Sequence, residues 1–245
     1  MPAAPPTPVV NLLLNALPPK ELERVLAHCE TVELLFGNTL CEPGQTYDYL
    51  YFPLDGFISL VTTLGPHRPL ELCLIGNEGM LGATLVLGLD VAPNRAVVQG
   101  SGRALRISTA RLGQALRESP HLLRALKRYL YVLTMQLAQN VACAHFHAVE
   151  PRLARWLLMS HDRAHSDHLT LTHEFLADML GVRRSGVTIA AGALQVRSLI
   201  HYSRGKITIL DRPGLEAAAC ECYGALNQGY ARLLSPHPPP PPSLA

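Results

Sequence analysis

Residues 170–210 constrain the fold of this chain more than any other stretch. Thr172 can cap a helix, in which apolar residues recur at helical spacing up to Gly181. A second apolar set with the same periodicity follows the glycine. The small Ala177 lets two helices cross closely, Gly181 permits a tight turn, and the Val187 side chain packs the second helix against the interior. This pattern predicts a helix-turn-helix.

Two short strand-like segments follow the second helix. They cover residues 199–202 and 207–210, and residues 203–206 join them. Gly205 can take a positive φ angle, as a tight hairpin requires. A helix-turn-helix followed by a hairpin predicts a winged helix.

The charge of this region indicates what it binds. Between Met179 and Leu210 there is no Asp or Glu, while the cations are Arg183, Arg184, Arg197, Arg204 and Lys206. The whole chain has a formal net charge of only +2, so positive charge is concentrated here, as on a surface that meets phosphates. Two arginines also begin the second helix, where the dipole disfavours each cation by roughly 0.3–1 kcal/mol. We therefore expect double-stranded DNA as the partner; the alternative is a solvated basic face on a protein-interaction domain.

Residues 172–195 and 200–223 closely resemble the DNA-binding domain of the Crp/Fnr family of bacterial transcription regulators. By this resemblance the recognition helix enters the major groove near its first turn, and the wing lies on the DNA backbone. The DNA-binding residues that it implies are Thr172, Arg183, Arg184, Ser185, Thr188, Arg204 and Lys206. The sequence departs from the family at Ser198, where a glycine is usual.

The preceding part of the chain has a different character. From Thr31 to Ile107, turn signals recur about every ten residues with β-branched and aromatic residues between them, which predicts a small sandwich or barrel. The segments YLYFPLDGFISL, IGNEGMLGATLVLG and APNRAVVQGSGRALRI resemble the cyclic-nucleotide-binding-type jelly roll of the same family. That resemblance covers residues 12–118 and implies a sensor-like domain.

The nucleotide-binding residues of the family are incomplete in this sequence. A cyclic nucleotide would need a Gly-Glu pair for the ribose and an Arg-Ser or Arg-Thr pair for the phosphate. Here Ala83 follows Gly82, and the turn containing Arg95 lacks a neighbouring hydroxyl. The candidates for an effector pocket are Glu78, Gly82, Ala83, Asn94 and Arg95. We expect the jelly-roll fold without affinity for cyclic nucleotides, and an unknown small-molecule effector.

A helical period follows in residues 119–146. Leucines alternate spacings of three and four, as in the seam of a coiled coil: Leu123, Leu126, Leu130, Leu133 and Leu137. The alternative is a helix that packs on its own sandwich. A homodimer is favoured because two recognition helices related by a two-fold axis read two half-sites. The resulting domains are the jelly roll (12–118), the dimerisation helix (119–146), the winged helix (147–235) and a disordered proline-rich tail (236–245).

The cysteines and histidines do not predict a metal site. The six cysteines form no CxxC pair, and the iron–sulfur branch of the family uses N-terminal cysteines that are absent here. His161, His165, His168 and His173 are clustered in sequence, yet no carboxylate completes a metal-binding pattern. We expect reduced thiols, no metal and no cofactor.

Together these features predict an α+β protein: an N-terminal jelly roll, a long dimerisation helix and a C-terminal winged helix-turn-helix. We expect a cytoplasmic transcription regulator that binds a two-fold operator as a homodimer and contacts RNA polymerase, with no membrane partner, since no run approaches ~18 apolar residues. No arrangement of a nucleophile and a base indicates catalysis. The alternative is a cupin-like metalloenzyme with a basic docking module. The operator, and the choice between activation and repression, are open.

Overall fold

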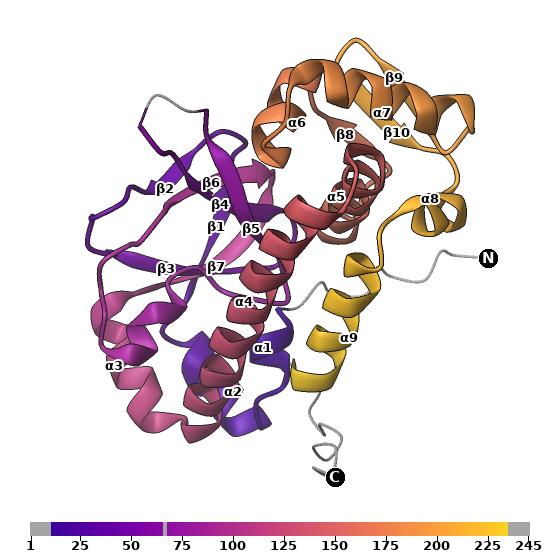
Figure 1. Cartoon of the computed structure of the whole chain (residues 1–245). Helices are drawn as coiled ribbons and strands as arrows, with labels where there is room; N and C mark the ends of the chain where they lie inside the picture. The colour runs from indigo at the N-terminus through magenta and orange to yellow at the C-terminus, as the bar shows by residue number, and fades with distance from the viewer. Residues whose placement is uncertain (1–10, 66–67, 235–245) are drawn as a thin grey trace, which may run out of the picture.

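The computed structural model describes residues 11–65 and 68–234. It confirms the predicted α+β architecture, with a β-sandwich, a long helix beside it and a winged helix at the far end of that helix (Figure 1). The predicted disordered tail, residues 236–245, lies outside the described residues. No helix in the described part of the chain is long and apolar enough to cross a membrane.

The sandwich consists of two antiparallel sheets. Their orders are β1-β7-β3 and β2-β6-β4-β5. Leu34 and Ala104 from one sheet pack against Ile58 and Val98 from the other, so the apolar faces form one core between the sheets. The strands are β1 (Glu30–Leu34), β2 (Thr39–Cys41), β3 (Tyr49–Pro53), β4 (Phe57–Thr62), β5 (Leu70–Ile75), β6 (Arg95–Gly100) and β7 (Gly102–Ser108).

Short helices close the sandwich on the side of the long helix. They are α1 (Leu12–Asn15), α2 (Pro19–Leu26), the 3-10 helix η1 (Ala83–Leu87) and α3 (Thr109–Glu118). Asn11 is fully buried; its side chain accepts from the first turn of α1 and donates to the carbonyl groups of Pro53 and Gly79. Because all its polar atoms are paired, this buried amide fixes α1 to the sandwich at little energetic cost.

Helix α4 (Pro120–Phe146) begins where the hydroxyl of Ser119 accepts from the amide of Leu122. Three side chains of its first half are buried in the core of their own N-terminal domain: Leu122, Leu126 and Tyr129. This corrects the assignment of Leu126 to a dimer seam, because its apolar surface is already covered within the chain. The other four predicted seam leucines are half-buried.

An exposed stripe on α4 lies next to the predicted leucine seam, shifted from it by one residue. It also alternates spacings of three and four, and consists of Arg124, Lys127, Tyr131, Thr134, Ala138, Val141 and His145. Tyr131 and Val141 are 59% and 72% exposed. We call this set the α4 stripe.

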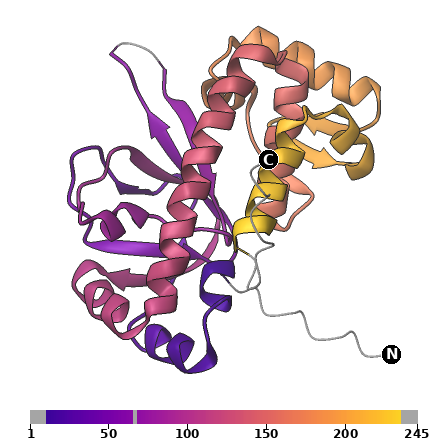
Figure 2. The same cartoon turned by 60° about the horizontal axis from the view of Figure 1, so that its bottom comes forward.

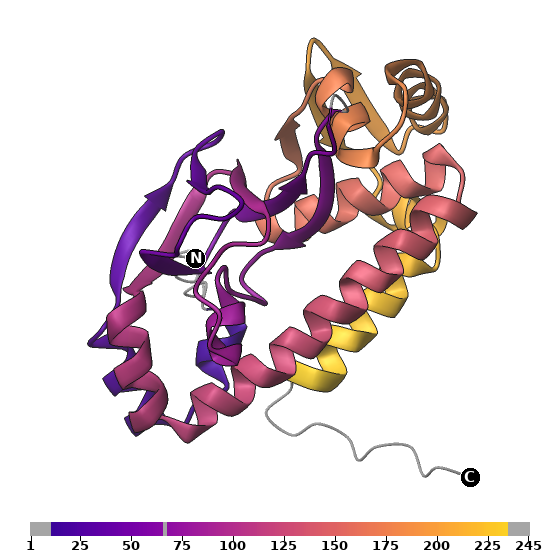
Figure 3. The same cartoon turned by 60° about the vertical axis from the view of Figure 1, so that its left-hand side comes forward.

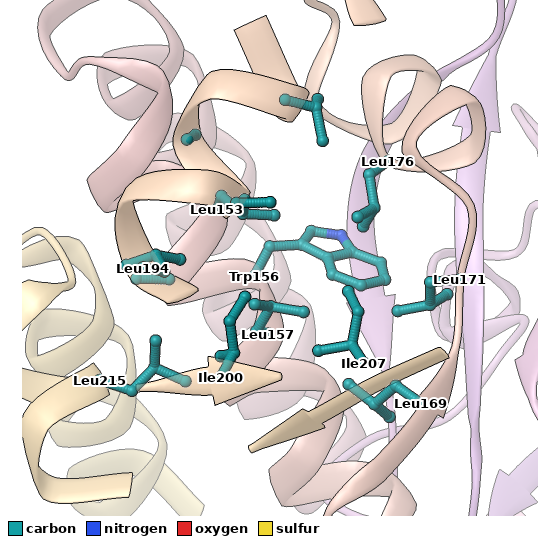
Figure 4. Packing of buried hydrophobic residues seen from close by; sticks show 14 of the residues in the cluster. Leu153, Trp156, Leu157, Leu169, Leu171, Leu176, Leu194, Ile200, Ile207 and Leu215 are labelled. Carbon is teal, nitrogen blue, oxygen red and sulfur yellow. The ribbon is translucent and has the colours of Figure 1, made fainter. Parts of the chain in front are cut away.

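The C-terminal domain is built around α5 (Val149–Ala164). Figure 4 shows Trp156 of this helix among leucine and isoleucine side chains from every other element of the domain, including Leu194 and Ile207. The elements are β8 (His168–Thr170), α6 (His173–Leu180), α7 (Arg184–Val196), β9 (Ile200–Ser203), β10 (Lys206–Ile209) and α8 (Arg212–Ala218). The winged helix is thus confirmed, with one strand, β8, that the sequence pattern did not reveal.

The last helix, α9 (Cys222–Leu234), leaves the winged helix and runs back along α4 (Figures 2 and 3). Leu226 packs with Phe57, Leu74 and Met159, so α9 fills the angle between α4, α5 and the sandwich. Tyr230 donates a hydrogen bond of 2.7 Å to Gln136 of α4. The helix therefore joins the two parts of the chain.

Polar contacts across this junction are buried. The Arg163 guanidinium donates two hydrogen bonds, of 2.7 and 2.9 Å, to Glu78, and the two side chains are only 6% and 8% exposed. The indole of Trp156 donates to Glu71 at 2.8 Å, and burial raises the pKa of Glu71 to about 7. A buried ion pair of this kind favours this docked orientation over other docked ones, because those would leave each charge buried without its partner.

The Glu78–Arg163 pair gives a direct stability prediction. Glu78→Gln should lower the free energy of unfolding by about 3–5 kcal/mol, because Arg163 would stay buried without its counterion. Urea denaturation of the full chain measures this loss. The control is Arg103→Gln at the exposed Asp55–Arg103 pair, which should cost far less because water already screens both charges. Equal losses in the two variants would show that the buried pair does not hold the junction.

Candidate nucleic-acid interface

The helix-turn-helix forms as its residues predict. The hydroxyl of Thr172 accepts from the amide of Phe175 at 3.1 Å and caps α6. Gly181 ends α6 with φ at 64°, a left-handed conformation that glycine adopts without strain. Ala177 and Val187 are both buried where α6 and α7 cross. The turn and the crossing together fix the direction in which α7 projects.

The amino end of α7 is strongly electropositive. Arg183 is the N-cap residue and Arg184 the first helical residue; both are exposed, and no side chain caps this end. The first turn of a helix has free amide N–H groups, and the two arginines add their positive charge at the same end of α7. Such an arrangement binds an anion such as phosphate.

The five cations of the segment divide into two groups. Arg197 pairs with Glu150 at 3.0 Å and is therefore neutralised within the chain. Over residues 11–65 and 68–234, no carboxylate lies within ion-pairing distance of Arg183, Arg184, Arg204 or Lys206. Four cations thus stay available to an external partner.

The wing is a tight hairpin next to α7. Ser203 pairs with Lys206, so Arg204 and Gly205 form a two-residue loop with φ angles of 48° and 77°. Two positive φ angles are typical of the turn that matches strand twist. Ser198 also has a positive φ, 56°, which explains why a glycine is favoured at this position before the wing. The structure keeps that backbone conformation despite the serine.

A chain of side-chain contacts connects α6, α7 and the wing. The Thr188 hydroxyl donates its only proton to the carbonyl of Arg184. In the hydrogen bond of 3.0 Å between Thr188 and His173, the Nδ1–H group of the imidazole must therefore be the donor. The imidazole also stacks on Tyr202 at 4.1 Å. Burial, with the charge of Arg184 adding to it, lowers the pKa of His173. Thr188 therefore positions the helix, and its hydroxyl is already engaged.

Sequence reasoning missed one residue on the outer face of α7. Ile189 is 75% exposed and lies on the same side of the helix as Ser185. Hydrophobicity alone would assign Ile189 to the core. It follows Val187 by two residues, however, so helical geometry places it away from the buried face of α7. An apolar residue at a solvent-facing helix position was the sequence signal that could have identified it.

A cavity of about 380 Å³ lies between the sandwich and α4. Gly82, Ala83 and Asn94 line it together with Leu130, Leu133 and Leu137 of α4. The other two effector-pocket candidates are elsewhere and are corrected here. Glu78 is occupied by Arg163, and Arg95 turns outward to pair with Glu42 at 2.8 Å.

The clustered histidines do not converge. His161 contacts Asp167, His168 contacts Thr208, and His173 contacts Thr188, each with a partner of its own. The cysteines behave differently, since Cys143, Cys220 and Cys222 form one buried cluster at the end of α4. The sequence did not predict this cluster.

Comparison with known proteins agrees with this geometry. Residues 151–218 match the family described as Crp-like helix-turn-helix domain. The c-di-GMP responsive global regulator CLP of Xanthomonas campestris is 20% identical, with a TM-score of 0.63 over 78% of this chain and 98% of that one. A CRP/FNR family transcriptional regulator from Thermus thermophilus is 24% identical, with a TM-score of 0.64 over the same shares. A search of curated protein sequences found no match.

Proposed function

We propose that this chain, which has the Crp/Fnr-type fold and a Crp-like helix-turn-helix domain, is a transcription regulator that binds a two-fold DNA operator as a homodimer. The observation that carries the proposal is the unpaired cationic amino end of α7 beside the cationic wing. A protein-interaction domain would have no need for four cations free of internal partners, whereas DNA supplies a dense row of phosphates.

The exposed residues of α7 and of the wing have different roles in this proposal. Arg184 and Ser185 enter the major groove, where arginine pairs with the O6 and N7 atoms of guanine. Ile189 suits an apolar contact with a thymine methyl group. Arg204 and Lys206 contact phosphates, which fix the register of the protein without reading sequence.

Salt dependence separates the two kinds of contact. Arg184→Ala should weaken binding to the operator by about 1–3 kcal/mol more than binding to random DNA. Lys206→Ala should weaken both alike and reduce the slope of log K against log salt by about one unit, because one fewer counterion is released. Titrations on operator and scrambled duplexes, from low to high salt, measure both effects.

Arg117→Ala, at an exposed arginine on α3, is the matched control and should change neither affinity. Genome-wide footprinting of the wild-type protein supplies the operator. If Arg184→Ala lowers both affinities equally, Arg184 contacts the backbone and the base-reading role is wrong.

Dimerisation is assigned to the α4 stripe. Tyr131 and Val141 place apolar surface on the side of α4 that the described residues do not cover. The stripe has the spacing of a coiled-coil seam, so two copies of α4 can pack along it. The half-buried leucines Leu130, Leu133 and Leu137 border it and line the cavity.

Charges in the stripe should therefore split the dimer. In the double variant Tyr131→Asp with Val141→Asp, both carboxylates would be desolvated at the interface. Sedimentation velocity should show a monomer. Leu89→Asp, at an equally exposed apolar residue of the sandwich, should leave the dimer intact. A dimer in both variants would rule out the stripe.

The effector is proposed to be uncharged. None of the described residues that line the cavity is charged; its polar groups are those of Tyr47, Thr84, Asn94, Tyr131 and Thr134. A buried phosphate without a cation would pay a large desolvation cost. The lining also lacks histidine and carboxylate groups, so the cavity does not support the cupin-like metalloenzyme.

Cyclic AMP should accordingly not raise the Tm of the protein. A ligand that binds only the folded state and is present at about 100 times its Kd stabilises by about 2.7 kcal/mol. Thermal denaturation with increasing nucleotide tests this, and cyclic GMP provides a second nucleotide of the same charge. A saturable rise in Tm with either would contradict the proposal.

A further inference from the structure

Four potential metal ligands meet where α4 ends and α9 begins. They are Cys143, His147, Cys220 and Cys222, and their ligand atoms all lie within 4.8 Å of one another. The three cysteines are 2%, 7% and 1% exposed. The ligands form two short-range pairs, with Cys143 and His147 one helical turn apart and Cys220 and Cys222 on either side of a single residue.

The spacing of these atoms fits one tetrahedral ion. Sγ of Cys143 and Sγ of Cys220 are 3.6 Å apart, and Sγ of Cys222 is 3.5 Å from Nδ1 of His147. Bonds of about 2.3 Å to sulfur and about 2.0 Å to nitrogen give tetrahedral edges of about 3.8 and 3.5 Å. A disulfide would instead need sulfur atoms about 2.05 Å apart.

The groups around the cluster suit a metal ligand set. Nδ1 of His147 faces the sulfur atoms, while Nε2 lies 3.1 Å from Oε1 of Glu221. A carboxylate on the outer nitrogen orients a ligating imidazole. Gln139 donates a hydrogen bond to Sγ of Cys222.

We propose that Cys143, His147, Cys220 and Cys222 bind a single Zn²⁺ ion as a closed structural site. Three thiolates and one imidazole are a ligand set typical of structural zinc, and four protein ligands leave no open position for catalysis. Binding displaces the protons of the thiols and involves no change of oxidation state.

The site connects segments far apart in the sequence. Cys143 and Cys220 are separated by 77 residues, and the amide of Cys220 also donates to the carbonyl of Pro151 in α5. An ion at this point therefore fixes the end of α4, the start of α5 and the turn into α9. If the proposed function holds, zinc sets the orientation of the DNA-binding domain relative to the dimer helix.

Metal content tests the site independently of DNA binding. Untagged full-length protein, purified under reducing conditions, should contain one zinc per chain by mass spectrometry of the metal. Cys143→Ser, Cys222→Ser and His147→Ala should each lose it. Glu221→Gln should keep the ligands and weaken zinc affinity at least about tenfold. Cys29→Ser and His145→Ala should retain full zinc, because Cys29 packs against the core of the N-terminal domain and His145, two residues from Cys143, is not among the four ligands.

Cobalt substitution of the wild-type chain avoids dependence on variants that fold poorly. Co²⁺ should give the intense visible bands of tetrahedral thiolate coordination, and zinc should abolish them. X-ray absorption of the zinc protein should show sulfur at about 2.3 Å and nitrogen at about 2.0 Å in a ratio of three to one. Absence of tetrahedral bands, an octahedral spectrum, or a Cys143–Cys220 disulfide in freshly reduced protein would overturn the proposal.

The functional consequence is measured separately. Removal of zinc with a chelator should lower both the Tm and the operator affinity, and added zinc should restore both. Arg184→Ala should weaken DNA binding with its zinc intact. Zinc bound at these residues with no operator found would leave the metal site standing and refute only the proposed function.

Discussion

The burial of α5 on almost every side is the constraint on which the rest of the structure depends. One side of the helix packs Leu153 and Leu157 into the winged helix, and the other meets the sandwich and α9 through Met159. A helix in this position cannot present a polar face to water, so its two buried arginines need partners within the chain. Arg163 reaches Glu78 and Arg155 reaches Asn140 of α4, and these partners fix how the domains dock.

The local features that are unfavourable for folding gather on the surface assigned to DNA. Cations occupy the amino end of α7, and Ser198 and Arg204 have left-handed backbones. Within the described residues, the shielded Nε2 atom of the half-buried His173 has no hydrogen-bond partner. Each of these choices costs stability, and the rest of the winged helix follows ordinary packing rules. Selection for a binding surface explains their concentration in one place better than chance does.

The sequence predicted the fold well where patterns are local, and less well where partners are distant. Caps, turn glycines and apolar periodicity located the winged helix, and turn spacing located the sandwich. The leucine pattern of α4 did not show which leucines pack on the sandwich domain of the same chain. A leucine buried there, such as Leu126, has the same helical spacing as a leucine at a dimer interface. Asn94, in the turn before β6, lines the cavity, while the next residue, Arg95, turns outward, because neighbouring side chains of an extended chain point to opposite sides. No local rule could bring Cys143 to Cys220.

Helix α4 provides a short physical path from the cavity to the proposed DNA-binding surface. Its successive faces meet the cavity, α9 and the α4 stripe, and two residues, Tyr131 and Thr134, belong to both the cavity lining and the stripe. A ligand in the cavity would therefore contact side chains of the proposed dimer surface directly. Because the end of α4 is also joined to α5 and α9 at the cysteine cluster, a rotation of α4 would be transmitted to the recognition helices. If the cavity binds the proposed effector, linkage requires that operator binding change effector affinity by the same factor as the effector changes operator affinity.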